Sequence, residues 1–258
     1  MCSVTFIELV QLKPMPRRTT AIAATLTLLA LGSPLMTSCA DSLPLEIQYY
    51  NQGVDKYDAG NYQGAIDDYT KAIDVDPQNA YAYYNRGKAK YDLLDYQEAI
   101  ADYTKAIEID PQYAKAYYNL GLAKYTLGDY KGAIVEYTKA IEIDPQNADA
   151  YSNRGVAMDD LQDYQGAIAD YTKAIEIDPQ HANAYSNRSN TKLKLGDYEG
   201  TQQDSSKAIE IDPSSPYAYQ NRGISRELLN DLEGACDDWR KAADFGLEAP
   251  AEWVKNQC

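Results

Sequence analysis

Histidine and cysteine, two residue types that often act as catalytic bases and nucleophiles, are scarce in this 258-residue chain. His181 is the single histidine, and the four cysteines are Cys2, Cys39, Cys236 and Cys258. One histidine supplies no histidine-based metal site. Because each cysteine has another expected role, a cysteine–histidine nucleophile pair is not available either.

Adjacent carboxylates recur along the chain, as in the pairs Asp67 and Asp68, Asp159 and Asp160, and Asp237 and Asp238. Neighbouring residues on a helix do not face each other, so these pairs do not converge on one substrate bond and are expected on solvated faces. The sequence has no phosphate-binding glycine loop, EF-hand calcium loop or nucleophile elbow. It therefore predicts a protein that is not an enzyme and that needs no cofactor and no metal.

The segment DYTKAIEIDPQ occupies residues 102–112 and recurs unchanged at residues 170–180. Related segments begin at residues 68, 136 and 204, so the period is 34 residues throughout. A fixed period of this length indicates stacked supersecondary units that bury their apolar faces against one another. Six units are predicted, at residues 46–79, 80–113, 114–147, 148–181, 182–215 and 216–249.

Each unit has the pattern of two helices. In the second unit we expect helices over about residues 81–93 and 97–109, with a turn at residues 94–96 and Pro111 ending the second helix. Gly87 lies inside the first helix, where glycine costs about 1 kcal/mol relative to alanine. Its recurrence, together with Ala99 and Ala106, predicts close approach of the two helices.

These residues resemble the tetratricopeptide repeat, through Tyr83, Gly87, Tyr91, Ala99, Tyr103, Ala106 and Pro111 of the second unit. The resemblance covers residues 46–249 and implies an all-α, right-handed solenoid of six helix–turn–helix units. Residues 250–258 are expected to form a capping helix with Trp253 against the sixth unit. The fifth unit departs from the pattern at Ser189, Thr201, Gln202 and Ser205, so we expect it to be the loosest.

The resemblance also implies that the first helices line a concave groove. The fifth position of each unit reads Tyr50, Tyr84, Tyr118, Ser152, Ser186 and Gln220, and seven residues later, about two helical turns, Tyr57, Tyr91 and Tyr125 recur. Tyrosine gives wide contact at low entropic cost, which suits peptide capture. The alternative is that repeat duplication copied a tyrosine-rich unit.

Asparagine occupies the sixth position of every unit, as Asn51, Asn85, Asn119, Asn153, Asn187 and Asn221. An amide both donates and accepts hydrogen bonds, so such a row suits the main chain of an extended peptide; asparagine is also common at this position in the family. A carboxylate clamp of the kind used by chaperone adaptors of the family needs lysine at the fifth position and asparagine at the ninth. Such a clamp is not expected here, because tyrosine stands at the fifth position and Val54, Lys88 and Leu122 stand at the ninth.

Residues 1–38 have the pattern of a signal peptide, with Arg17 and Arg18 before an apolar run at residues 21–31 and Met15 as an alternative start. The segment ending at Cys39 resembles a bacterial lipobox, which predicts lipidation of Cys39 before a linker at residues 39–45. The alternative is ordinary cleavage nearby. Either reading predicts an exported protein of the cell envelope or periplasm.

Cys236 takes an apolar position of the sixth unit, and Cys258 ends the predicted cap. We expect a disulfide between them, which contributes about 3 kcal/mol in the loop-entropy model; the alternative is two buried thiols.

The net charge of −15 disfavours nucleic acid and favours a neutral or basic protein or peptide partner. The predicted function is a lipid-anchored adaptor that binds an extended peptide. The alternative is a soluble, exported structural or self-associating module, and the oligomeric state is left open.

Overall fold

The structure, a computed structural model, describes residues 43–258 and consists there of thirteen α-helices. The predicted signal peptide, Met15 and the proposed lipidation site Cys39 lie outside the described residues. The helices are α1 (Leu45–Asp58), α2 (Tyr62–Val75), α3 (Ala80–Asp92), α4 (Tyr96–Ile109), α5 (Ala114–Thr126), α6 (Tyr130–Ile143), α7 (Ala148–Asp160), α8 (Tyr164–Ile177), α9 (Ala182–Lys194), α10 (Tyr198–Ile211), α11 (Pro216–Leu228), α12 (Leu232–Asp244) and α13 (Glu248–Gln257).

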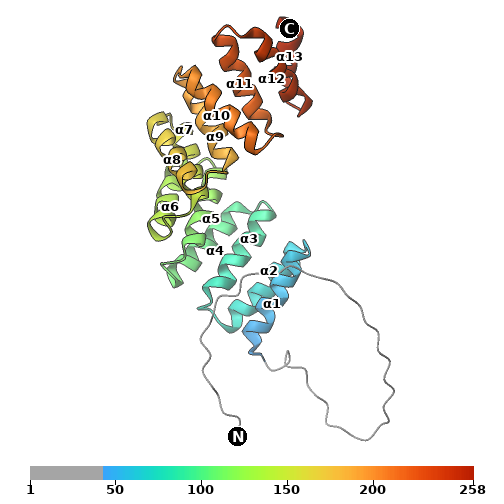
Figure 1. The fold of residues 1–258 in the computed structure, drawn as a ribbon. Helices are drawn as coiled ribbons and strands as arrows, with labels where there is room; N and C mark the ends of the chain where they lie inside the picture. Colours follow the sequence, from blue (N-terminus) through green and yellow to red (C-terminus); the bar gives the residue numbers. More distant parts are fainter. Residues whose placement is uncertain (1–42) are drawn as a thin grey trace, which may run out of the picture. The chain divides into compact units, whose positions relative to one another are not determined.

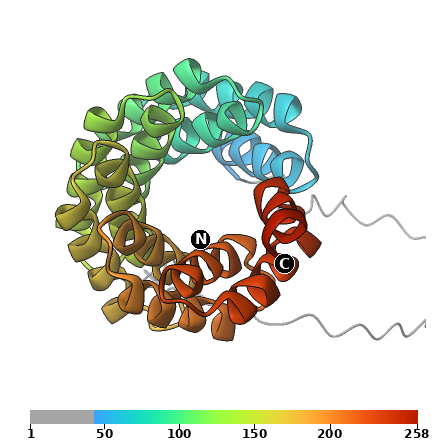
Figure 2. The same cartoon turned by 90° about the horizontal axis from the view of Figure 1, so that it is seen from above.

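The helices pack as consecutive antiparallel pairs, and each pair stacks on the next (Figure 1). The first helices of neighbouring pairs also contact one another, which places them on the inner side of the curved stack. Viewed from above, the pairs form a ring with one helix of each pair inside (Figure 2). The predicted all-α solenoid is therefore confirmed for residues 43–258.

The helix boundaries follow from local chemistry. Helix α4 ends at Ile109, and Asp110 has an extended backbone, which is the conformation favoured before Pro111. The turn between α3 and α4 places Leu94 at a positive φ of 66°, where most repeats have glycine or a polar residue. At the start of α9, the ring nitrogen Nδ1 of His181 accepts a hydrogen bond from the backbone of Ala184, so the lone histidine caps a helix.

A buried tyrosine forms the centre of each of the first four repeats. Tyr69, Tyr103, Tyr137 and Tyr171 are each at most 2% exposed. A Cβ atom placed on Gly87 would lie 2.8 Å from Cε1 of Tyr103, so the glycine of the first helix makes room for the ring of the second. This contact explains why glycine recurs inside a helix despite its low propensity.

The sixth repeat has Trp239 where the earlier repeats have this tyrosine. Trp239 is 1% exposed, and its ring centroid lies 5.3 Å from that of Trp253 on α13, in an edge-to-face arrangement. Helix α13 is also joined to α12 by a disulfide between Cys236 and Cys258, whose Cα atoms are 5.8 Å apart. The last helix therefore covers the apolar end of the stack.

Candidate binding groove

The predicted groove tyrosines form hydrogen bonds between neighbouring repeats. The Nδ2 atom of Asn85 donates to the hydroxyl of Tyr50 at 2.8 Å. Asn119 donates in the same way to Tyr84 at 2.9 Å, and Asn153 to Tyr118 at 2.8 Å. The predicted tyrosine and asparagine rows are thus joined in the first half of the stack, because each of these asparagines donates one of its two N–H groups to the tyrosine of the preceding repeat.

Burial keeps these tyrosine hydroxyls protonated. It raises the pKa of Tyr118 to about 12, an effect that the carboxylate of Asp149 strengthens and that the bond from Asn153 opposes. Burial likewise raises the pKa of Tyr50 and of Tyr84. At neutral pH each hydroxyl therefore accepts a bond from its asparagine and keeps its own proton.

A second row of tyrosines forms hydrogen bonds about two helical turns further along. Tyr125 donates to Oδ2 of Asp160 at 2.6 Å, and the hydroxyls of Tyr91 and Thr126 are 3.1 Å apart. Tyr57 donates to Asp92, while the ammonium group of Lys88 lies 4.7 Å from the centroid of the Tyr57 ring. The second row therefore also joins neighbouring repeats.

The second half of the stack replaces these contacts with others. Ser152 and Ser186 stand in place of the tyrosine, and no described residue hydrogen-bonds the side chain of Asn187. Asn221 is 6% exposed and donates to the carbonyl of Ser186 at 3.3 Å and to Oγ of Ser189 at 2.9 Å. Of the predicted row, Asn51 is exposed at the first repeat, where no earlier repeat is available to it.

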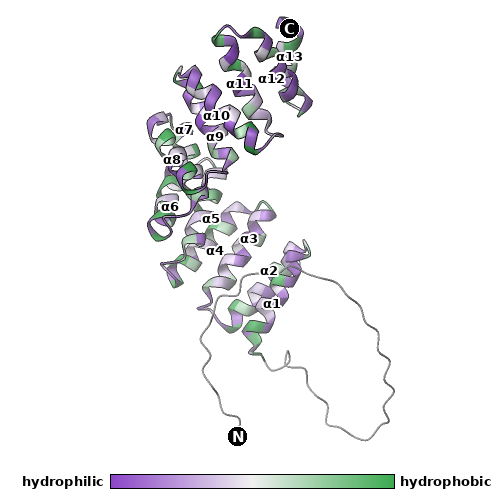
Figure 3. Ribbon diagram, in the orientation of Figure 1, coloured by the Kyte–Doolittle hydropathy of each residue, from purple (hydrophilic) through white to green (hydrophobic). Residues whose placement is uncertain are grey.

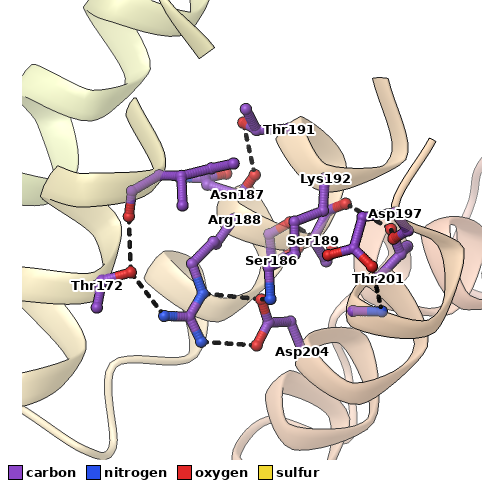
Figure 4. A network of polar contacts seen from close by, with 12 residues as sticks. Thr172, Ser186, Asn187, Arg188, Ser189, Thr191, Lys192, Asp197, Thr201 and Asp204 are labelled. Atoms are coloured by element: carbon purple, nitrogen blue, oxygen red, sulfur yellow. Dashed lines mark hydrogen bonds and ion pairs between the residues drawn. The ribbon is translucent and has the colours of Figure 1, made fainter. Parts of the chain in front are cut away.

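The fifth repeat has a polar interior, as its departures from the pattern suggest. Ser189, Thr201 and Ser205 are all fully buried. Thr201 donates to the carbonyl of Asp197 at 2.7 Å, and Ser189 donates to that of Ser186 at 2.7 Å (Figure 4). The Oγ atom of Ser205 has no partner among the described residues. Charged and amide residues are also frequent in this part of the stack, where purple, the hydrophilic end of the scale, predominates (Figure 3).

An arginine contact that the sequence analysis missed joins three helices. Arg188 forms two bonds to the carboxylate of Asp204, at 2.8 and 2.7 Å, and a third to Oγ1 of Thr172 on the preceding repeat at 2.9 Å (Figure 4). Bidentate pairs of this kind are both strong and directional. The same contact occurs at Arg86, Arg154 and Arg222. It is missing from the third repeat, where Leu120 stands in place of arginine.

A cavity of about 480 Å³ opens between α9 and α11, on the face that the first helices share. Its walls are Asn183, Ser186, Asn187, Asn190, Leu193, Ser215, Tyr217, Gln220, Asn221 and Ile224. Most of these residues were not predicted as site residues, although the loss of tyrosine at Ser186 and Gln220 is visible in the sequence. On this face the earlier repeats leave a cavity of only about 60 Å³, between α5 and α7, so the groove is hollow chiefly at the joint of the fifth and sixth repeats.

The part of the chain that the structure describes contains neither a candidate metal site nor a candidate membrane-spanning helix. Within residues 43–258, no group of three His, Cys, Asp or Glu side chains is placed to hold a metal ion. No helix in this part of the chain is both long enough and apolar enough to cross a bilayer.

Comparison with solved structures places the fold among repeat proteins. A MamA protein is 29% identical, with a TM-score of 0.61 over 66% of this chain and 93% of its own. YrrB, a TPR protein with an unusual peptide-binding site, is 24% identical, with a TM-score of 0.61 over 73% and 97%. PilF of Pseudomonas aeruginosa is 16% identical, with a TM-score of 0.72 over 85% and 100%. The last two likenesses concern the fold alone.

Family comparison agrees with the repeat assignment. No curated protein matches the chain. A model of the TPR repeat matches residues 53–93, 95–128 and 123–159, and two models of the tetratricopeptide repeat match residues 148–181 and 170–203. Proteins of this kind are generally non-catalytic modules for protein interaction. The chain belongs to the tetratricopeptide repeat family.

Proposed function

We propose that this protein is a non-enzymatic adaptor whose concave face binds an extended segment of another protein. The observation that carries the proposal is the row of asparagines on the first helices from Asn51 to Asn187, since Asn221, the sixth, is buried and bonded within the protein. Asn85, Asn119 and Asn153 each use one of their two N–H groups on a tyrosine, but no described residue donates to Oδ1 of these three amides. These oxygens suit the N–H groups of a peptide main chain.

The partner we propose is a neutral or basic protein segment. A net charge of −15 attracts basic chains and repels nucleic acid. YrrB shares this fold and is described as a TPR protein with a peptide-binding site, so the fold itself is compatible with the peptide binding that we propose.

We further propose that the protein is exported and anchored in the cell envelope through lipidated Cys39. The disulfide between Cys236 and Cys258 supports an oxidising compartment, where such bonds persist. Labelled palmitate should enter the wild-type protein and not the Cys39→Ser variant. Equal labelling of the wild-type protein and the variant would disprove the lipid anchor and leave the proposal of peptide binding unaffected.

The groove is tested by recovering partners from membranes with a variant that carries Tyr84→Ser, Tyr118→Ser and Asn119→Ala. Serine is tolerated at the equivalent Ser186, so the repeats should still stack. We expect partner recovery to fall at least tenfold. The matched control is Val135→Ser on α6, whose side chain is 57% exposed and lies outside the groove residues.

Two outcomes would count against the adaptor. Unchanged recovery with the triple variant would exclude the groove as the binding surface. Recovery of a second copy of this chain in place of another protein would favour the alternative, a self-associating repeat module.

A further inference from the structure

The joint between the fifth and sixth repeats differs from the earlier joints in being hollow. At the joint of the second and third repeats, Tyr84 fills the space between first helices and bonds to Asn119. Ser186 takes the place of Tyr84 in the fifth repeat and lines the cavity of about 480 Å³. This volume lies within the roughly 300–1,000 Å³ range of pockets that hold small ligands.

The cavity is lined by amides and hydroxyls and by no charged side chain. Five amide side chains contribute to it, together with the hydroxyls of Ser186, Ser215 and Tyr217. Leu193 and Ile224 supply the apolar part of the wall. In a chain with a net charge of −15, such an uncharged hollow selects against ions of either sign, because a charge entering it would lose water without gaining an opposite charge.

Four of these amides have hydrogen-bonding capacity to spare. No described residue bonds the side chains of Asn183, Asn187, Asn190 and Gln220. The fifth, Asn221, is buried and held by Ser186 and Ser189, so it is fixed by the protein itself. Unpaired donors and acceptors therefore meet in one cavity, whereas Asn85 and Asn119 each use one of their two N–H groups on a tyrosine.

We propose that this cavity is a subsite for an uncharged, amide-bearing stretch of peptide, such as one with glutamine or asparagine side chains. An amide ligand donates and accepts in equal measure, as the cavity walls do. The methylene groups of a glutamine side chain match Leu193 and Ile224. This inference rests on the proposed adaptor function and assigns the uncharged part of the ligand to the fifth and sixth repeats.

The test uses ¹H–¹⁵N NMR of the chain titrated with the capped dipeptide N-acetyl-Gln-Gln-amide. We expect shifts confined to α9 and α11. The corresponding Glu-Glu and Lys-Lys dipeptides should bind at least tenfold more weakly. Shifts spread over all repeats, or a stronger response to either charged dipeptide, would overturn the proposal.

Two variants locate the site. Ser186→Tyr restores the residue of the earlier repeats and should abolish the shifts by filling the cavity. Because this variant can also disturb Asn221, the double variant Asn187→Ala and Gln220→Ala tests the same point with the cavity left open; it should weaken binding at least tenfold. Gln165→Ala, which removes an exposed amide on the second helix α8 outside the groove, should leave binding unchanged. Full binding by the double variant would refute the assignment.

A carbohydrate offers similar chemistry and is the competing occupant. If N-acetylglucosamine produced the α9 and α11 shifts and the dipeptide did not, the cavity would be a sugar site and the proposal wrong. The outcome also separates this inference from the adaptor function. Partner recovery that survives the double variant but is lost with the Tyr84, Tyr118 and Asn119 variant would keep the adaptor and reject the subsite.

Discussion

The second and fifth repeats have the same backbone plan but different interiors. Helices α3 and α9 each have 13 residues, and α4 and α10 each have 14. The second repeat packs Tyr103 against Gly87, whereas the fifth has Ser205 and Ser189 at the same places. Ser189 can replace the glycine where Ser205 replaces the tyrosine, because the small side chain of Ser205 does not need the space that glycine leaves for a tyrosine ring. The 34-residue period therefore specifies how the helices stack, while a few side chains decide whether the interior of a repeat is aromatic or polar.

The first prediction tests how much the tyrosine core contributes. Tyr103→Ala should destabilise the second repeat by about 3–5 kcal/mol, the usual cost of removing a buried aromatic side chain. Ser205→Ala, the equivalent change in the fifth repeat, should be neutral or stabilising because the hydroxyl of Ser205 is buried without a partner. Amide hydrogen exchange in α4 and α10 measures each repeat locally, which suits repeat arrays that do not unfold in two states.

If Tyr103→Ala lowered amide-exchange protection in α4 by about as much as Ser205→Ala lowered it in α10, the two side chains would contribute equally to the stability of their repeats. The prediction that the fifth repeat is the loosest would then be wrong. A lower protection of α10 in the wild-type chain would support it.

The second prediction concerns the pairing of glycine with tyrosine. Gly87→Ala should destabilise the wild-type chain by about 1–3 kcal/mol, because its Cβ would lie 2.8 Å from Tyr103 Cε1 and overpack the interface. In the Tyr103→Ala background only the approach to the backbone oxygen of Ala99 at 3.3 Å remains, so the same change should stabilise, by less than the propensity gain of about 1 kcal/mol of alanine over glycine. Urea unfolding of the four chains of this cycle measures the reversal of sign. A destabilisation of equal size in both backgrounds would show that Tyr103 is not what requires the glycine.

The repeat architecture was predictable because every repeat encodes it again. The expected helices at residues 81–93 and 97–109 lie within one residue of α3 and α4 at each end. The groove contacts were harder to predict from the sequence, since the bond from Asn85 to Tyr50 depends on how one repeat is rotated relative to the next. A signal was nevertheless present for the arginine contact: the third repeat loses arginine at Leu120 and has Glu136 in place of the aspartate.

The cavity was not predictable from the groove positions alone. Sequence shows that Ser186 replaces tyrosine, but a smaller side chain can leave a hollow or let the helices close. Here the helices close in part, because α9 and α11 approach each other more closely than the first helices of the earlier repeats do, and Asn221 bonds to Ser186 and Ser189 between them. The cavity lies beside this contact. Such an outcome depends on the packing of several side chains at once.

The third prediction has the smallest effect and compares two asparagines of the same row. Asn119→Ala should cost about 1 kcal/mol, the net value of its bond to the hydroxyl of Tyr84. In a Tyr84→Phe background the same substitution should cost nothing further, since the bond is already gone. Asn187→Ala should leave stability unchanged because no described residue bonds that side chain. Urea unfolding compares the variants. An equal cost at both positions would mean that Asn187 has a partner within the protein, and its amide would then not be available to a ligand.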